Sequence, residues 1–176
     1  MPSSSSSSSP SNKNLAYIAL GSNLGDSRGT ILQAMDRLQV LSLAPILRSS
    51  LWESTPVDCP TGSSKFINAV IALLPRAGET PESLLEQLQN WEREFGRQPK
   101  TIHNEPRPLD LDLIAFGREV RATSELTLPH PRTQFRRFVL QPLSEIAPDL
   151  ILPGQSETIG HLLAVLTSAE SLRRIE

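Results

Sequence analysis

Short apolar runs, separated by amphipathic stretches, organise the hydrophobic pattern of this chain. Each run is bounded by turn-forming or polar residues, which is typical of strands in a sheet. The first run ends in Gly21-Ser22-Asn23 and predicts a buried strand followed by a turn. The runs that predict strands are 15–20, 47–54, 66–74 and 109–116.

Two amphipathic stretches between these runs predict helices. Asp26 or Ser27 can cap the first helix. The second begins at Thr80, with Pro81 at the first helical position, and Gly96 can end it. Their apolar positions follow helical spacing and are Ile31, Leu32, Met35 and Leu38 in the first helix and Leu84, Leu85, Leu88 and Trp91 in the second.

The order of these elements is strand, helix, strand, strand, helix, strand. This order predicts an α+β fold with a ferredoxin-like βαββαβ core. Further helices, expected over 133–146 and near 158–166, would be added at the C-terminal end. We find no internal repeat, and we expect residues 15–176 to form a single domain.

The first fourteen residues, MPSSSSSSSPSNKN, differ in composition from the rest. This Ser/Pro-rich segment, 1–14, cannot bury apolar area, so we expect a disordered leader without a structural role. It lacks the apolar region of a secretory signal. An organelle transit peptide is the alternative, although the stretch has neither arginine nor an amphipathic pattern.

Composition narrows the classes of partner. The chain has 176 residues and a formal net charge of −2, so its overall field predicts neither a nucleic-acid nor a membrane partner. No apolar run approaches the length of a membrane-spanning helix. The single cysteine, Cys59, cannot form an internal disulfide, which fits a reducing compartment. We expect a cytoplasmic monomer that meets any anionic substrate with a local basic cluster.

The run at 109–116 carries the most informative pair of residues. On a strand, residues two apart point to one face, so Asp110 and Asp112 should lie side by side while the leucines between them face the core. A solvated strand face is the alternative. We favour a cation site because aspartate is disfavoured in strands and adjacent anions repel. Carboxylate oxygens suit Mg²⁺, which shares its shell with substrate phosphates.

Basic residues accompany the aspartates and predict a polyphosphate held between metal and arginines. Arg132 and Arg136 would share a helix face at a spacing of four, although such a pair alone is more often surface charge. The sequence contains no P-loop, dinucleotide fingerprint or zinc cluster. The two basic groups are Arg97, Lys100, His103 and Arg107, and His130, Arg132, Arg136 and Arg137.

The sequence resembles the 6-hydroxymethyl-7,8-dihydropterin pyrophosphokinase family over nearly all of residues 15–155. The P-R-x-x-D-L-D core at 106–112 is highly specific to that family. Departures from some members at Pro99, Asn104 and Pro131 concern loop closure. Four blocks occur in the family's order: AYIALGSNLGD (16–26), the WESTPVD and FINAVIAL block (52–73), FGRQPKTIHNEPRPLDLDLIAFG (95–117) and LTLPHPRTQFRRFVLQPLSEIAPDL (126–150).

The resemblance implies a transferase of folate biosynthesis that moves a pyrophosphoryl group from ATP to the pterin, leaving AMP. It implies two Mg²⁺ ions that bridge the ATP phosphates, with Asp110 and Asp112 as protein ligands. Arg97 and Arg107 are similar to the family's catalytic loop arginines, which act on the transferring diphosphate. The positions that the resemblance assigns to ATP binding are Gln89, Glu92, Lys100, Thr127, His130 and Arg136.

The resemblance also implies a pterin site. Asn68 matches the residue that reads the pterin edge, and Thr55 starts a loop whose backbone contacts the pterin. Phe66 and Phe138 match two aromatics that sandwich the ring. From the residues alone, either phenylalanine could be plain core, although stacking a flat heterocycle between them is physically sensible.

Two other readings keep the fold without this chemistry. A ferredoxin-like module that binds RNA should carry aromatic signatures on its central strands, and the runs 66–74 and 109–116 lack them. An inactive relative is the other alternative. The presence of both aspartates, both loop arginines, Asn68 and His130 argues against it.

Overall fold

The computed structural model describes residues 14–54, 65–96, 108–167 and 171–175. Along the chain these form β1 (Ala16–Ser22), α1 (Ser27–Leu38), a 3-10 helix (Gln39–Leu41), β2 (Leu47–Arg48), β3 (Leu51–Ser54), β4 (Phe66–Leu73), α2 (Pro81–Glu94), β5 (Asp110–Phe116), β6 (Arg121–Ala122), β7 (Thr127–Leu128), a 3-10 helix (Thr133–Phe135), α3 (Arg137–Ile146), α4 (Ile159–Val165) and β8 (Leu172–Ile175).

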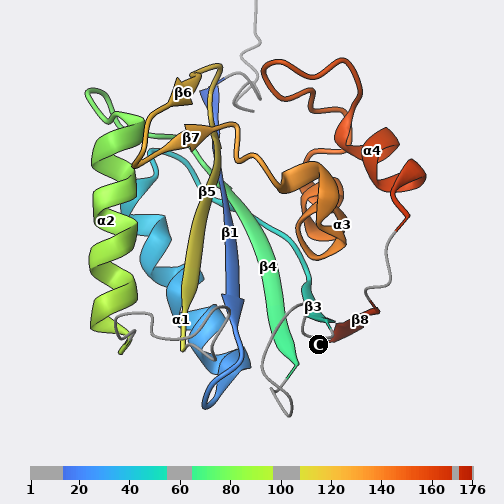
Figure 1. The fold of residues 1–176 in the computed structure, drawn as a ribbon. Helices are drawn as coiled ribbons and strands as arrows, with labels where there is room; N and C mark the ends of the chain where they lie inside the picture. The colour runs from blue at the N-terminus through green and yellow to red at the C-terminus, as the bar shows by residue number, and fades with distance from the viewer. Residues whose placement is uncertain (1–13, 55–64, 97–107, 168–170, 176) are drawn as a thin grey trace, which may run out of the picture.

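One antiparallel sheet forms the centre of the fold (Figure 1). Its strand order is β5-β1-β4-β3-β8, and the short β2 also pairs with β4. β1 therefore lies between β5 and β4, which places the first and last strands of the βαββαβ unit side by side. This topology confirms the predicted α+β, ferredoxin-like core. β6 and β7 form a separate two-stranded ribbon.

The helices begin where the sequence indicates. The Asp26 carboxylate accepts a hydrogen bond from the Gly29 backbone N–H at 3.2 Å and caps α1. At α2, the Thr80 hydroxyl accepts from the Ser83 N–H at 3.0 Å, and the Ser83 hydroxyl accepts from the Thr80 N–H at 2.9 Å. This reciprocal capping box satisfies donors that would otherwise be unpaired at the helix start.

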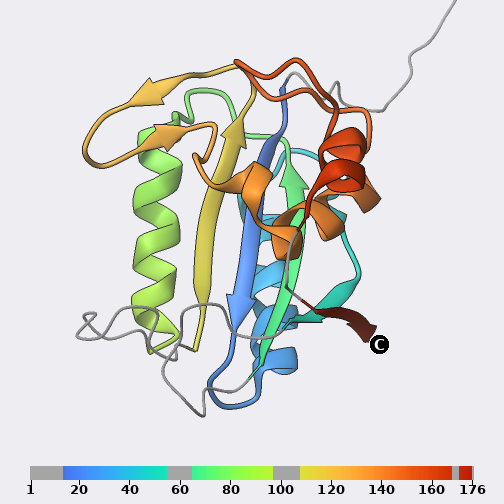
Figure 2. The ribbon, with the colours of Figure 1, turned by 45° about the vertical axis from the view of Figure 1, so that its right-hand side comes forward.

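Helices cover the two sides of the sheet differently, as Figures 1 and 2 show. α1 and α2 pack on one face, where the apolar side chains of α1 and α2 join alternate residues of the central strands in one buried cluster. α3 and α4 pack on the other face over a second cluster, which includes Tyr17 and Val70. β1 lies between both clusters, and all seven of its residues are buried. No helix in the described ranges is long and apolar enough to span a bilayer.

Several stretches differ from the sequence-based expectation. The expected strand 47–54 is interrupted because the Val70 N–H donates to the Ser49 hydroxyl at 2.9 Å instead of to a backbone carbonyl. The expected helix 133–146 begins as a 3-10 turn, and α3 starts only at Arg137. The strand β8 was not predicted, because its short, charged sequence Leu-Arg-Arg-Ile carries little strand signal.

Candidate active site

Strand register brings several predicted site residues together at one end of the sheet. Gly21 of β1 pairs with Asp110 of β5 on one side and with Asn68 of β4 on the other. A β-carbon at Gly21 would lie 3.6 Å from Asn68 Oδ1, 3.7 Å from Phe66 Cδ1 and 4.0 Å from Asp110 Cβ. Because Gly21 has no side chain, a space remains there that a carboxylate, an amide and an aromatic ring border.

The two aspartates take the alternating arrangement that the sequence predicts. Asp110 and Asp112 are half-buried, whereas Leu111 and Leu113 are buried in the cluster beneath α1 and α2. Asp112 pairs with Ala19, two residues before Gly21, so both carboxylates belong to the face on which Gly21 lies open. Among the described residues, no group of three or more His, Cys, Asp or Glu side chains could hold a metal ion. Mg²⁺ is commonly bound by one or two protein carboxylates when substrate phosphates complete its coordination shell, so the pair is sufficient.

α2 supplies a carboxylate that bonds to the backbone between the two aspartates. Glu92 Oε2 accepts a hydrogen bond from the Leu111 N–H at 2.6 Å, which ties α2 to the free edge of β5 beside both aspartates. Gln89 lies three residues earlier, on the same side of the helix, and is exposed. Gln89 is therefore reachable by a ligand at this edge, while Glu92 already has a backbone partner.

His130 bonds to β5 through its backbone. Its backbone N–H donates to the Ile114 carbonyl at 2.8 Å, and its Nδ1 accepts from the Arg132 N–H at 3.2 Å. Burial, followed by the positive charges of Arg136 and Arg132, lowers the pKa of His130 to about 4, against a smaller opposing effect of Asp110. His130 is thus neutral near pH 7, and because Nδ1 is an acceptor, Nε2 carries the proton.

The predicted pairing of Arg132 and Arg136 on one helix face is wrong. The intervening residues form a 3-10 turn in which the buried Thr133 donates its hydroxyl to the His130 carbonyl at 3.1 Å. Arg136 then has an extended backbone at the start of α3. Its guanidinium lies 5.4 Å from the centroid of the Phe138 ring, in the range of a cation–π contact.

The residues assigned to the pterin come from strands and from the start of α3. Asn68 is buried at 3% exposure, and Phe66, two residues before it, is half-buried on the same face of β4. Phe138 is half-buried in the first turn of α3 and packs against the second apolar cluster. The structure thus places an amide and one ring beside Gly21, and the second ring on the helix that covers the adjoining part of this face.

Other predicted residues fall elsewhere. Thr127 is exposed in β7, on the ribbon outside the main sheet. Two residues of the cluster were not singled out from the sequence, Gly21 and Ser54, because their neighbours depend on strand register. The Gly21-Ser22-Asn23 turn was the available signal for the first. The predicted residues that lie outside the described ranges are Thr55, Arg97, Lys100, His103 and Arg107.

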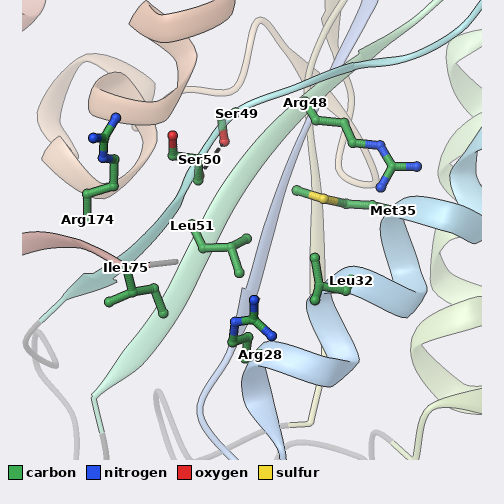
Figure 3. A pocket seen from close by; sticks show the side chains of 9 residues that line it. All are labelled: Arg28, Leu32, Met35, Arg48, Ser49, Ser50, Leu51, Arg174 and Ile175. Atoms are coloured by element: carbon green, nitrogen blue, oxygen red, sulfur yellow. Dashed lines mark hydrogen bonds between the residues drawn. The ribbon is translucent and has the colours of Figure 1, made fainter.

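A separate hollow of about 370 Å³ lies on the α1 side of the sheet (Figure 3). Leu51 of β3, Ile175 of β8 and Leu32 of α1 face it, with Arg28 at one end. Leu51 belongs to the apolar cluster beneath α1 and α2. The hollow therefore shares no residue with the cluster around Gly21.

Comparison with known proteins gives one consistent family. The model of "7,8-dihydro-6-hydroxymethylpterin-pyrophosphokinase (HPPK)" matches residues 17–148. A 2-amino-4-hydroxy-6-hydroxymethyldihydropteridine pyrophosphokinase from Pseudomonas aeruginosa is 40% identical over 138 residues, which cover 78% of this chain and 83% of that protein. The Bacillus subtilis protein of the same name is 39% identical over 134 residues, covering 76% of this chain and 78% of its own length.

Longer proteins contain a similar region. The folic acid synthesis protein fol1 of Pneumocystis carinii is 40% identical over 140 residues, which cover 78% of this chain and only 18% of fol1. A solved HPPK-DHPS "in complex with substrates" has a TM-score of 0.65 at 16% identity, covering 86% of this chain and 43% of that one. Plasmodium falciparum HPPK-DHPS with pteroate gives a TM-score of 0.66 at 16% identity, covering 86% and 42%. The chain thus spans less than half of these longer proteins, and the two structures support the fold.

A family match over residues 17–148, together with bacterial relatives that align over most of their length, shows that this chain belongs to the 7,8-dihydro-6-hydroxymethylpterin-pyrophosphokinase family of transferases.

Proposed function

We propose that this chain transfers the terminal diphosphate of ATP to the hydroxymethyl group of 6-hydroxymethyl-7,8-dihydropterin, in folate biosynthesis. Family membership supports the reaction. One structural observation carries the proposal: Gly21 lies between Asp110 and Asn68, which sets a carboxylate pair next to a buried amide and a half-buried ring. Such a site can bind a metal-bound phosphate at the carboxylate pair and a flat, polar heterocycle at the amide and the ring.

The carboxylate pair is the proposed metal site. Asp110 and Asp112 would hold Mg²⁺ because both side chains are oxygen donors on one face of β5. The number of ions, two, rests on the sequence resemblance. When bound, the metal supplies neutralisation of the negative charge on the polyphosphate.

The side chains around β5 provide the rest of the proposed ATP site. His130, neutral and with its proton on Nε2, can donate a hydrogen bond to a phosphate oxygen, and Arg136 adds a positive charge nearby. Exposed Gln89 is the proposed contact for adenosine. We also assign Glu92, Lys100 and Thr127 to this site, and Arg97 and Arg107 to the transferring diphosphate, on the strength of the sequence resemblance.

The pterin would lie over the open position at Gly21. We propose that Asn68 binds the polar edge of the ring and that Phe66 and Phe138 stack on its faces. Thr55 would begin the backbone segment that contacts the same ring.

In the reaction the substrate hydroxyl oxygen forms a bond to the β-phosphorus of ATP. The bond from that phosphorus to the oxygen bridging the α-phosphate breaks, AMP leaves, and the hydroxyl proton goes to solvent. Catalysis then consists of orienting the two substrates and neutralising charge, and no protein general base is needed. Asp112 would be a weakened base because its charge is shared with a cation.

The test is to identify the nucleotide product. Purified protein is incubated with ATP, Mg²⁺ and the hydroxymethyl dihydropterin, and the products are separated by chromatography and analysed by ³¹P NMR. We expect AMP and the pterin diphosphate in equal amounts, and neither without pterin or with a chelator. ADP would contradict pyrophosphoryl transfer. An absence of any product, with the protein folded, would favour the inactive relative.

We also propose that residues 15–176 act as a single domain, as a monomer in the cytoplasm, with a dispensable leader. Deleting residues 2–13 should leave the melting temperature and the activity nearly unchanged, because a Ser/Pro-rich segment buries no apolar area. Size-exclusion chromatography coupled to light scattering measures the oligomeric state. A large loss of stability or activity in the truncated protein would show that the leader docks on the domain.

A further inference from the structure

The amide of Asn68 has its nitrogen turned into the protein. Asn68 Nδ2 donates to Ser54 Oγ at 2.7 Å, and the carbonyls of Trp52 and Phe66 lie within 3.3 Å and 3.4 Å of the same nitrogen. An amide NH₂ group has two hydrogens, so these three acceptors occupy its donor capacity. What remains for a ligand is the amide oxygen, which can only accept.

The amide oxygen faces the open position at Gly21. Asn68 Oδ1 is the atom nearest to an ideal β-carbon on Gly21, at 3.6 Å, in the space that Phe66 and Asp110 also border. The two backbone carbonyls set this orientation, because a turned amide would bring its oxygen against carbonyl oxygens. The Ser54 hydroxyl makes the shortest of the three bonds and holds the amide in place.

Ser54 is well placed to do this. It is the last residue of β3, is 2% exposed, and pairs in register with Phe66, while Asn68 pairs with Trp52. On the far side, Ser54 pairs with Leu172 of β8, so its backbone is held between two strands. A hydroxyl on a strand paired on both sides has little freedom to move away from the amide.

We propose that Ser54 is a positioning residue that fixes the Asn68 amide with its oxygen toward the substrate, so that the site selects a ligand edge carrying N–H donors. The inference rests on the proposed function and deepens it. A pterin presents such donors in its exocyclic amino group and its ring N–H. In the proposed arrangement the exocyclic amino group faces the amide oxygen. The matching 2-oxo ring, a lumazine, keeps ring N–H donors but has a carbonyl at that position, and an acceptor opposite an acceptor is disfavoured.

Six proteins and three ligands test the proposal. In Ser54→Ala the amide loses its shortest bond, so the dissociation constant for the pterin should rise about five- to tenfold, the effect of one hydrogen bond. The dissociation constant for a nonhydrolysable ATP analogue should stay within about twofold, since Ser54 does not border the carboxylate pair. The preference for the pterin over the 2-oxo ring should fall. Ser54→Thr, which keeps a hydroxyl, should restore both values.

Ser49→Ala is the matched control. Ser49 is also a buried serine, located between β2 and β3, and its hydroxyl contacts β4, where it accepts from the Val70 N–H at 2.9 Å. Ser49→Ala should lower the melting temperature about as much as Ser54→Ala without changing pterin affinity. A Ser54→Ala effect equal for both ligands, or matched by Ser49→Ala, would show a merely structural role.

A double-mutant cycle supplies the decisive measurement. If Ser54 acts through Asn68, adding Ser54→Ala to Asn68→Ala should change pterin affinity by less than about twofold. A full five- to tenfold effect that persists without Asn68 would overturn the inference. If the wild-type protein binds the pterin and every Ser54 variant equals it, this inference alone is wrong. If the wild-type protein does not bind the pterin, the proposed function is wrong.

Discussion

The two faces of the central strands contrast sharply, although the same strands contribute alternate residues to each face. On the face beneath α1 and α2, Leu20, Leu111 and Ile67 all lie in one buried cluster. On the opposite face, at the same level of the sheet, Gly21, Asp110 and Asn68 form a row across three strands. A strand with a period of two can thus hold the core with one set of side chains and present polar groups with the other.

The polar face is itself divided. α3 and α4 cover the part that contains Tyr17 and Val70, whereas the cluster around Gly21 lies beyond the apolar residues they bury. Phe138 and Arg136 stand at the border, one in the first turn of α3 and the other at its start. A substitution on the polar face should therefore lower activity, and a substitution on the face beneath α1 and α2 should lower stability. A substitution at the border should affect ligand binding, with smaller effects on stability and on activity.

The largest expected effect on activity comes from the polar face. Asp112→Asn keeps the shape of the side chain but removes a charge, and activity should fall at least ~100-fold, comparable to the loss of one preorganised electrostatic contact. Without metal, the melting temperature should hold or rise, because repulsion between Asp110 and Asp112 is relieved. Steady-state assays across Mg²⁺ concentrations measure the first effect. Asp149→Asn, at an exposed position, is the control. If Asp112→Asn has the wild-type rate at ordinary Mg²⁺ concentration, the assignment of Asp112 as a metal ligand is wrong.

A core substitution should do the opposite. Ile18 is fully buried in the cluster beneath α1 and α2, so Ile18→Ala should cost about 2–5 kcal/mol of unfolding free energy. At a temperature where the variant is fully folded, kcat/KM should stay within about twofold of the wild type. Urea denaturation and assays at low temperature measure both. Val40→Ala, at a position 68% exposed, is the control; a 100-fold activity loss in folded Ile18→Ala would mean that the two faces are not independent.

A residue at the border should have an intermediate, ligand-specific effect. Phe138→Ala should weaken pterin binding by ~1–3 kcal/mol, the value of stacking a flat ring on an aromatic side chain. ATP binding should change much less. Isothermal titration with each ligand separates the two, and Phe135→Ala, at a ring that is 64% exposed, is the matched control. Equal losses for both ligands, or a general loss of stability, would assign Phe138 to the core.

The smallest effect concerns pH. The pKa of His130 is lowered to about 4 in the folded protein, against ~6.5 in an unfolded chain, so the unfolded state binds more protons between these values. His130 therefore contributes stability above about pH 6.5 that is lost as pH falls toward 4. In metal-free His130→Gln, the fall in melting temperature from pH 7 to pH 4.5 should be several degrees smaller than in the wild type. If the melting temperatures of the two proteins fall equally between pH 7 and pH 4.5, His130 does not contribute to the loss of stability in acid.

Local signals explain which parts of the fold could be predicted. Asp26, Thr80 and Pro81 mark helix starts through contacts within a few residues, and the alternation at 109–116 fixes which side chains of β5 point inward. The start of α3 could not be read in the same way. There a side-chain bond from Thr133 to the His130 carbonyl competes with the helix, and that bond has no strong sequence signature.

The residue types of the candidate site were predictable, as was the shared face of Asp110 and Asp112, but their neighbours on other strands were not. Asp110, Asp112 and Asn68 were identified from the sequence, yet their positions around Gly21 depend on how β1 is aligned with β4 and β5. A shift of one residue in either alignment would carry the polar groups to the other face. Ser54 was missed for the same reason, since its contact with Asn68 crosses from one strand to the next.

The late arrival of β8 has a consequence for the newly made chain. Arg173 of β8 bonds to Glu53 of β3 at 3.1 Å, across 120 residues of sequence. At about 5–20 residues per second, synthesis of that interval takes on the order of ten seconds. Throughout this time the outer edge of β3 has no strand beside it and is open to pairing with another polypeptide. Glu53, a charged residue on that edge, discourages such encounters until Arg173 has been made and can bond to it.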